Sequence, residues 1–177
     1  MNRTLITTLL ILFGASVLYC QQAVVYVDAT NGDDLLGDGK NQTNEHSGLG
    51  PIKSIRRALY LVADRGTIIL LAGEYGGSNW DGGDIVISSA SAPHVKSQLT
   101  LMAQTQMNNQ CVDITAGSLV VDIDKLELNV ETANRTEYFN LAGKLVLGSK
   151  DHSVKMNIQT SSNFRLKSAE PILSRSI

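Results

Sequence analysis

The segment from Val24 to Tyr75 constrains the fold of this chain more than any other. It opens with the apolar run VVYV, crosses a polar loop rich in glycine and aspartate, and reaches a helix-like stretch after Pro51. A second apolar run, TIILL, follows at Thr67–Leu71. We therefore predict a strand, a long loop, one amphipathic helix and a second strand, in that order.

The predicted helix covers Ile52–Asp64. Ser54 is placed to act as its N-cap, and Gly66 is a typical stop signal just beyond its end. Apolar side chains recur at i, i+4 and i+7, which is the spacing of a single helical face: Ile55, Leu59 and Val62. This face predicts that the helix covers an apolar surface elsewhere in the fold.

From Thr67 onward, the helical period gives way to short runs in which apolar and polar residues alternate. We predict roughly ten short strands and no second helix. The longer strands recur at Leu99, Leu119 and Lys144, an irregular spacing that is compatible with the coils of one solenoid. The other runs begin near Asp84, Cys111, Leu126, Phe139, Val154 and Phe164.

The N-terminus has the layout of a secretory signal peptide. A positive start at Arg3 precedes the apolar run Leu5–Leu18, which is too short to span a bilayer. We predict cleavage after Cys20, so that residues 1–20 are removed and the protein is secreted or held at the cell surface without a membrane span. The alternative is a lipoprotein in which Cys20 carries the lipid. Cleavage leaves Cys111 as the remaining cysteine, predicted to be a small buried or half-buried thiol.

The charge balance and the histidines exclude other classes of function. A net charge of −2 gives no support to a nucleic-acid partner. His46, His94 and His152 are isolated in the sequence, which argues against a zinc site. Asn41 and Asn134 begin glycosylation sequons, which have a meaning only in a eukaryotic secretory pathway.

Residues 24–75 resemble the N-terminal end of the right-handed parallel β-helix proteins of the pectin-lyase-like class. Those chains typically open with a Tyr-Val strand and an Asn-Gly-Asp-Asp loop, and their capping helix begins at Pro-x-x-Ser/Thr-Ile. The next strand is Gly-Asp-Thr-Ile and ends in Gly-x-Tyr. Arg65-Gly66-Thr67 lacks the aspartate of that strand motif. The matching residues are Tyr26, Val27, Asn31, Gly32, Asp33, Asp34, Gly39, Pro51, Ser54, Ile55, Ala58, Gly66, Thr67, Ile68, Gly73 and Tyr75.

The resemblance implies an all-β fold, a short right-handed single-stranded parallel β-helix of about four to five coils with an N-terminal capping α-helix. Residues 21–177 would form one domain, with the first strand, loop and capping helix in 24–66 and the coils in 67–177. An ordinary α+β domain, with one helix packed on a sheet, is the alternative. We expect an open C-terminal end, left either for a stacking partner or because the chain is part of a longer protein.

The acidic loop is the candidate metal site. Asp33, Asp34 and Asp38 supply the oxygen ligands that calcium prefers, and calcium is the cofactor this loop would take. Their spacing does not match an EF-hand. The alternative interpretation is that these side chains only structure the loop through Asx turns.

Two further features bear on carbohydrate chemistry. Trp80 lies in the segment GGSNWDGGD, where an exposed ring would stack on a sugar, although packing in the core or within a turn is the more common role of such a residue. Acidic residues on the polar side of successive strands could face a basic residue as in a lyase, or form a solvated strand face. The acidic residues are Asp113, Asp122, Asp124 and Glu127, and the basic ones are Lys125, Lys144, Lys155 and Arg165.

No aligned catalytic set emerges from these patterns, so no catalytic residue is assigned. We predict a non-catalytic secreted or cell-surface protein that binds a polysaccharide or cell-surface glycan, or acts in adhesion. The alternative is a polysaccharide lyase or glycosidase, or the N-terminal part of one, acting on acidic polysaccharide.

Overall fold

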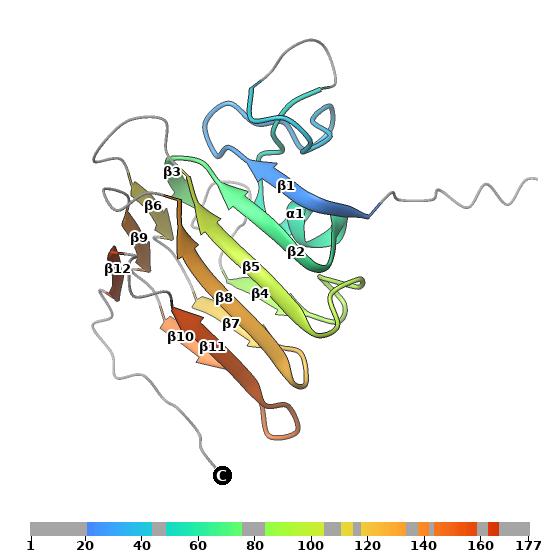
Figure 1. Cartoon of the computed structure of the whole chain (residues 1–177), viewed down its shortest axis with the longest axis vertical. Helices are drawn as coiled ribbons and strands as arrows, with labels where there is room; N and C mark the ends of the chain where they lie inside the picture. Colours follow the sequence, from blue (N-terminus) through green and yellow to red (C-terminus); the bar gives the residue numbers. More distant parts are fainter. Residues whose placement is uncertain are drawn as a thin grey trace, which may run out of the picture.

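The computed structural model describes residues 21–43, 49–75, 84–104, 111–114, 118–133, 138–141, 144–158 and 163–166. These residues contain one helix, α1 (Ile55–Leu61), and twelve strands (Figure 1). The strands are β1 (Gln22–Val27), β2 (Val62–Leu70), β3 (Gly73–Tyr75), β4 (Ile85–Ser88), β5 (Gln98–Ala103), β6 (Cys111–Ile114), β7 (Ser118–Asp122), β8 (Leu126–Thr132), β9 (Tyr138–Leu141), β10 (Lys144–Leu147), β11 (Val154–Ile158) and β12 (Asn163–Leu166).

Each pair of neighbouring strands in the sheets is parallel. The largest sheet has the order β1-β2-β5-β8-β11, and the two others have the orders β10-β7-β4 and β12-β9-β6-β3. Consecutive strands from β2 onward belong to different sheets. Two parallel neighbours cannot be joined by a tight hairpin, so the chain visits the other sheets before it returns to the same sheet. Strands that pair are therefore far apart in the sequence.

The expected fold class, an all-β right-handed single-stranded parallel β-helix of about four to five coils, is wrong. The described residues form open sheets of parallel strands with one helix, an α/β-type sheet arrangement that does not close into coils. The expected repeat also joined the wrong strands, since Leu119 and Lys144 lie in β7 and β10 rather than in the sheet of Leu99. Alternation identifies strands and their apolar faces, but it does not determine how sheets are connected.

The helix is shorter than the predicted Ile52–Asp64. Its N-cap is confirmed, since the Ser54 hydroxyl accepts a hydrogen bond from the Arg57 backbone N–H at 3.1 Å. The chain leaves the helix at Val62, because Val62 pairs with β1 and begins β2. Gly66 is therefore not the stop signal. It lies inside β2, where an added Cβ would come within 2.6 Å of the Val62 side chain.

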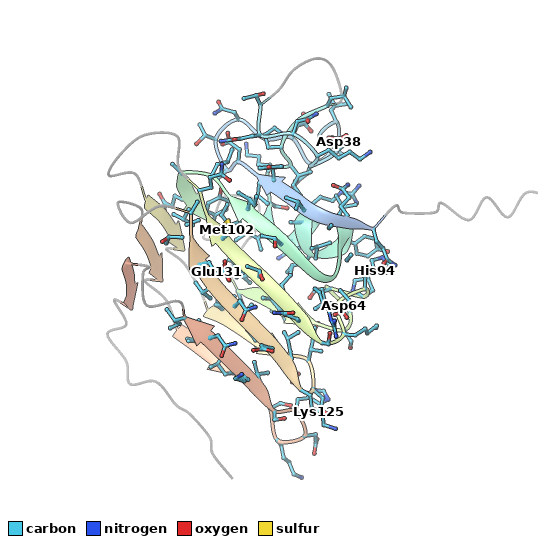
Figure 2. The ribbon with its side chains drawn as sticks, in the orientation of Figure 1. Asp38, Asp64, His94, Met102, Lys125 and Glu131 are labelled. Atoms are coloured by element: carbon cyan, nitrogen blue, oxygen red, sulfur yellow. The ribbon has the colours of Figure 1, made fainter. Side chains whose placement is uncertain are left out.

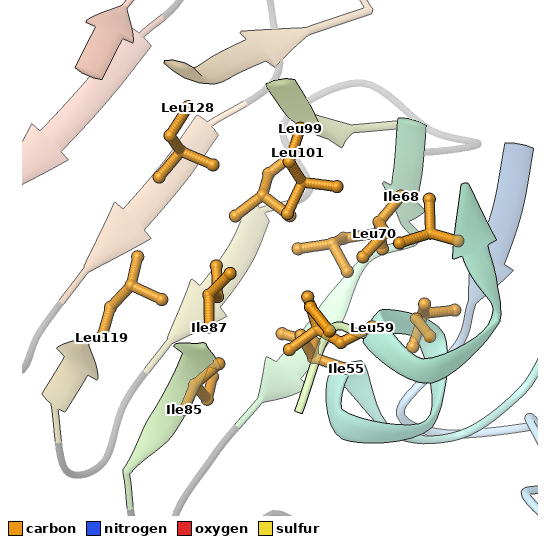
Figure 3. Close-up of a cluster of buried hydrophobic side chains, with 14 of the residues drawn as sticks. Ile55, Leu59, Ile68, Leu70, Ile85, Ile87, Leu99, Leu101, Leu119 and Leu128 are labelled. Atoms are coloured by element: carbon orange, nitrogen blue, oxygen red, sulfur yellow. The ribbon is translucent and has the colours of Figure 1, made fainter. Parts of the chain in front are cut away.

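The predicted apolar stripe of the helix is confirmed and belongs to one continuous core. Ile55 and Leu59 of α1 pack with Ile68 and Leu70 of β2, and all four are almost fully buried (Figure 3). Burying side chains of this size contributes about 1.5–3 kcal/mol each. The core continues through the apolar faces of the large sheet and of the β10-β7-β4 sheet: Ile85, Ile87, Leu99, Leu101, Leu119 and Leu128.

The outer edge of β1 is covered by the loop that follows it. The backbone N–H of Tyr26 donates to Gly39 O at 2.8 Å, and that of Asp28 donates to Ile52 O at 2.8 Å. Ile52 N–H in turn donates to Tyr26 O at 3.0 Å. Because these bonds satisfy backbone groups that an edge strand would leave open, this end of the large sheet is protected from pairing with another chain.

Candidate functional site

A pocket of about 290 Å³ lies between α1 and β4. Its wall combines an aromatic ring, two opposite charges and apolar carbon, a mixture typical of sites for small polar ligands. Side chains from the helix, the strand and the turn after it contribute: Arg56, Leu59, Tyr60, Asp84, Val86 and Ser91.

The helix places an aromatic and a cationic residue on the same side of the pocket. Arg56 and Tyr60 are four positions apart, so both follow the same helical face, while Leu59 turns inward and forms part of the apolar floor. The Tyr60 ring meets His94 edge to face, with ring centroids 6.4 Å apart. His94 Nδ1 also lies 3.0 Å from Gln21 Nε2. These contacts hold the aromatic wall in position.

The opposite wall depends on the alternation of β4. Ile87 is buried, whereas Val86 is 40% exposed and lines the pocket. The Ser91 hydroxyl donates to Val86 O at 2.5 Å and accepts from the Ser88 backbone N–H at 2.9 Å. Ser91 therefore fixes the turn against the strand, and Asp84 supplies the negative charge on this side of the pocket.

The acidic loop predicted as a calcium site has its carboxylates bound to backbone amides. Asp33 accepts from Leu35 N–H at 2.8 Å and Leu36 N–H at 3.0 Å, and these bonds, the one from Leu36 foremost, lower the pKa of Asp33. Asp38 accepts from Lys40 N–H at 3.0 Å. Within the described residues, no group of three or more His, Cys, Asp or Glu residues could hold a metal ion. The geometry favours the loop-structuring role.

Asp34 has a more specific task in the same loop. Its Oδ1 accepts hydrogen bonds from the backbone N–H groups of Lys53 at 2.8 Å and Ser54 at 2.9 Å. The loop is thereby attached to the first turn of α1. Asp34 thus positions the helix that forms one wall of the pocket.

The predicted acidic strip is divided among separate partners. His152 Nδ1 lies 2.7 Å from Asp122 Oδ1, and hydrogen bonds with His152 and Ser149 lower the pKa of Asp122. The Lys155 ammonium donates to Glu127 Oε1 at 3.1 Å. This bond and one from the Asn157 amide lower the pKa of Glu127. A general acid needs a raised pKa, so both carboxyl groups are poorly suited to that role.

The remaining predicted residues take no part in a shared site. Asp124 Oδ1 accepts from the Ser153 backbone N–H at 3.3 Å, and Asp124 Oδ2 lies 3.9 Å from the exposed Lys125 ammonium. Several other residues lie outside the part of the chain whose side chains are described: Trp80, His46, Cys111, Asp113, Lys144 and Arg165. The predictions for those six stay predictions.

A row of polar side chains crosses the outward face of the large sheet. In register, Thr67 lies opposite Thr100, Thr100 opposite Asn129, and Asn129 opposite Asn157. The Asn157 amide donates to Asn129 Oδ1 at 3.0 Å. Met102 and Glu131 lie side by side on the same face (Figure 2). The amides in the row bond to one another, so this face is less suited to ligands than the pocket.

Sequence reasoning missed the pocket. It predicted the apolar stripe of the helix, but it gave no role to Arg56 or Tyr60 and did not bring their side of the helix to β4. The available signal was the i, i+4 spacing of Arg56 and Tyr60, which predicts a shared face. The approach of Asp84 depends on the packing of α1 against β4.

No family model, curated protein or solved structure matches this chain. The resemblance of residues 24–75 to the pectin-lyase-like class therefore stays a prediction. In the part of the chain that the structure describes, no helix is long and apolar enough to cross a membrane.

Proposed function

We propose that this is a secreted or cell-surface protein that binds glycans without catalysis, and that the α1–β4 pocket holds one sugar residue. The observation that carries the proposal is the position of Tyr60 beside Arg56 and Asp84 over an apolar floor. The pocket volume is at the low end of the range for ligand sites, which suits a single ring.

The chemistry of the pocket matches that of a hexose. A sugar ring presents an apolar C–H face and a rim of hydroxyl groups. The partly exposed Tyr60 ring can pack against the apolar C–H face of the sugar. Arg56 donates and Asp84 accepts, so together they can bind neighbouring hydroxyls, which both donate and accept. The opposite charges of the two residues favour a neutral sugar over a strongly acidic one.

The rival function, a polysaccharide lyase or glycosidase, has less support. Asp122 and Glu127, the best-described members of the acidic strip, both have lowered pKa values and separate partners. A lyase assay on polygalacturonate with calcium, monitored by ultraviolet absorbance of the unsaturated product, tests this alternative. Product formation by the folded protein would favour the lyase.

Glycan-array binding followed by calorimetry on the best ligand tests the proposal. Tyr60→Ala should weaken binding by at least about tenfold, and Asp84→Asn or Arg56→Ala by a similar factor, because each removes a direct contact. Tyr60→Phe should retain most of the affinity, since the ring face is kept.

Matched controls remove a tyrosine and a cation away from the pocket. Tyr26→Ala removes a half-buried tyrosine from the outward face of β1, and Lys96→Ala removes a cation from the loop before β5. Neither should alter the array profile. Equal losses in Tyr60→Ala and Tyr26→Ala, or a full profile in Tyr60→Ala, would contradict the assignment of the pocket.

Trp80 is tested separately because its position in the fold is not described. If Trp80 stacks on a sugar, Trp80→Ala should reduce array binding while Tyr60→Ala reduces it independently. An unchanged profile in Trp80→Ala would remove this residue from the glycan site.

A further inference from the structure

The two ends of the large sheet differ in how they are covered. Within the described residues, β11 pairs with β8 on one side and with no strand on the other. β10 and β12 are likewise the last strands of their sheets, and Figure 1 shows all three at the same end of the molecule. At the opposite end, the edge of β1 is covered by the loop that contains Gly39 and Ile52.

The apolar face of β11 is incompletely buried. One row of inward side chains runs from Val25 through Ile68, Leu101 and Val130, all at most 1% exposed, to Ile158, which is 40% exposed. Val154 and Met156 pack against the core but are only partly buried. Exposed edges of this kind favour pairing with another strand.

We propose that β11 pairs antiparallel with β11 of a second copy of this chain, forming a two-fold dimer. With Met156 on the symmetry axis, Val154 lies opposite Ile158 of the second copy and Lys155 lies opposite Asn157. The inward residues then face one another across the new pair, so the apolar core of each copy continues into the other. With a two-fold axis, both copies contribute the same edge to the interface, so the assembly stops at a dimer.

Other registers are less favourable. An axis through Lys155 would place two ammonium groups opposite each other, and like charges in that position are destabilising. A shift by one residue would turn the apolar face of the second copy toward solvent. Head-to-tail stacking would need a free edge at β1, whose backbone groups are already bonded to the loop. The second copy is therefore best placed edge to edge through β11.

Cysteine crosslinking tests the register. In a full chain carrying Cys20→Ser and Cys111→Ser, Met156→Cys places two thiols opposite each other, with Cα atoms about 4.5–5.5 Å apart, which suits a disulfide. Lys155→Cys places its thiol opposite Asn157 instead. Mild oxidation should give a covalent dimer with Met156→Cys and far less with Lys155→Cys. Equal crosslinking in both variants would overturn the register.

Sedimentation velocity tests the dimer in the chain with its native cysteines. We expect a monomer–dimer equilibrium, and Ile158→Lys should raise the dimer dissociation constant by at least about tenfold. Val24→Lys is the matched control, because Val24 is 39% exposed and lies on the covered edge strand β1. A wild-type chain that stays monomeric would show that another segment or partner covers β11 and would overturn the proposal. A dimer insensitive to Ile158→Lys, or open-ended polymers, would do the same.

Discussion

Asp64 is the residue that most directly joins two distant parts of the chain. Its Oδ1 accepts hydrogen bonds from the backbone N–H groups of Lys96 at 2.8 Å and Ser97 at 2.7 Å, and more weakly from Gln98 at 3.3 Å. The Ser97 hydroxyl donates to Oδ2 at 2.8 Å. Burial favours the neutral form, but the hydrogen bonds from Ser97, Lys96 and Gln98 outweigh it and hold the pKa of Asp64 far below its ordinary value of 3.8.

We expect Asp64→Asn to lower the free energy of unfolding at neutral pH by at least about 1 kcal/mol, because a charged acceptor is lost. The pKa of Asp64 is lower in the folded than in the unfolded protein, so its carboxylate stabilises the fold at pH values above the unfolded-state pKa. This stabilisation is lost as the pH falls toward the pKa of Asp64 in the folded protein. The difference between wild type and Asp64→Asn in urea unfolding should therefore shrink as the pH falls below about 4. A pH-independent difference would contradict the ionised role. Asp151→Asn, in an exposed turn, is the control.

Tyr75, the aromatic end of the Gly-x-Tyr motif, shows why that motif closes a strand. It is 1% exposed, and its hydroxyl lies 2.8 Å from Leu71 O and 2.9 Å from Val27 O. Tyr75→Phe should lower the free energy of unfolding by about 1–2 kcal/mol and the Tm by about 4 °C, because buried acceptors lose their donor. Thermal unfolding by circular dichroism measures this. Tyr26→Phe, on the half-buried outward face, should change little.

At the scale of elements, α1 depends on caps because it has only seven residues. Ser54→Ala removes the acceptor for the Arg57 N–H and should cost about 1 kcal/mol of unfolding free energy. Since α1 carries Tyr60, the same change should also weaken glycan binding, while Tyr60→Ala alone should leave stability nearly unchanged. Urea unfolding and calorimetry of the same samples separate the two effects. A stable Ser54→Ala protein with lost binding would contradict this coupling.

The loop between β1 and α1 gives a prediction about metal removal. Since backbone amides already occupy the carboxylates of Asp33, Asp34 and Asp38, adding calcium or a chelator should leave the Tm unchanged. Differential scanning calorimetry with each additive checks this. A calcium-dependent rise of several degrees that is lost in Asp33→Asn would restore the metal site.

The elements were more predictable than their arrangement. Local alternation and capping identified the strands, the N-cap at Ser54 and the buried stripe of the helix, because each signal lies within a few residues. The C-terminal end of α1 was not predictable, since Val62 enters β2 by pairing with Gln22, which lies far away in the sequence. The pocket was not predictable for the same reason, because Asp84 and Tyr60 line one pocket only through the packing of α1 on β4.

At the scale of the whole molecule, the covered edge of β1 predicts an uneven pattern of hydrogen exchange. The backbone N–H groups of Tyr26 and Asp28 bond to the loop, so β1 should be protected nearly as well as the central strands β2 and β5. β11 should exchange faster at low protein concentration and slow down as concentration rises and the proposed dimer forms. Fast exchange at Tyr26 and Asp28 would show that the loop does not cover this edge in solution.

The sequence by itself determined the strand-rich character of the chain, the amphipathic helix after Pro51 with its apolar stripe, and the alternation that assigns core and surface positions. These follow from side-chain periodicity, which is a local property. Only the tertiary structure decided that the parallel strands form open sheets, that β11 retains a partly exposed apolar face, and that Arg56, Tyr60 and Asp84 share a pocket. Parallel pairing joins residues far apart in the chain, as Thr67 and Thr100 show, and no local pattern encodes which of them will meet.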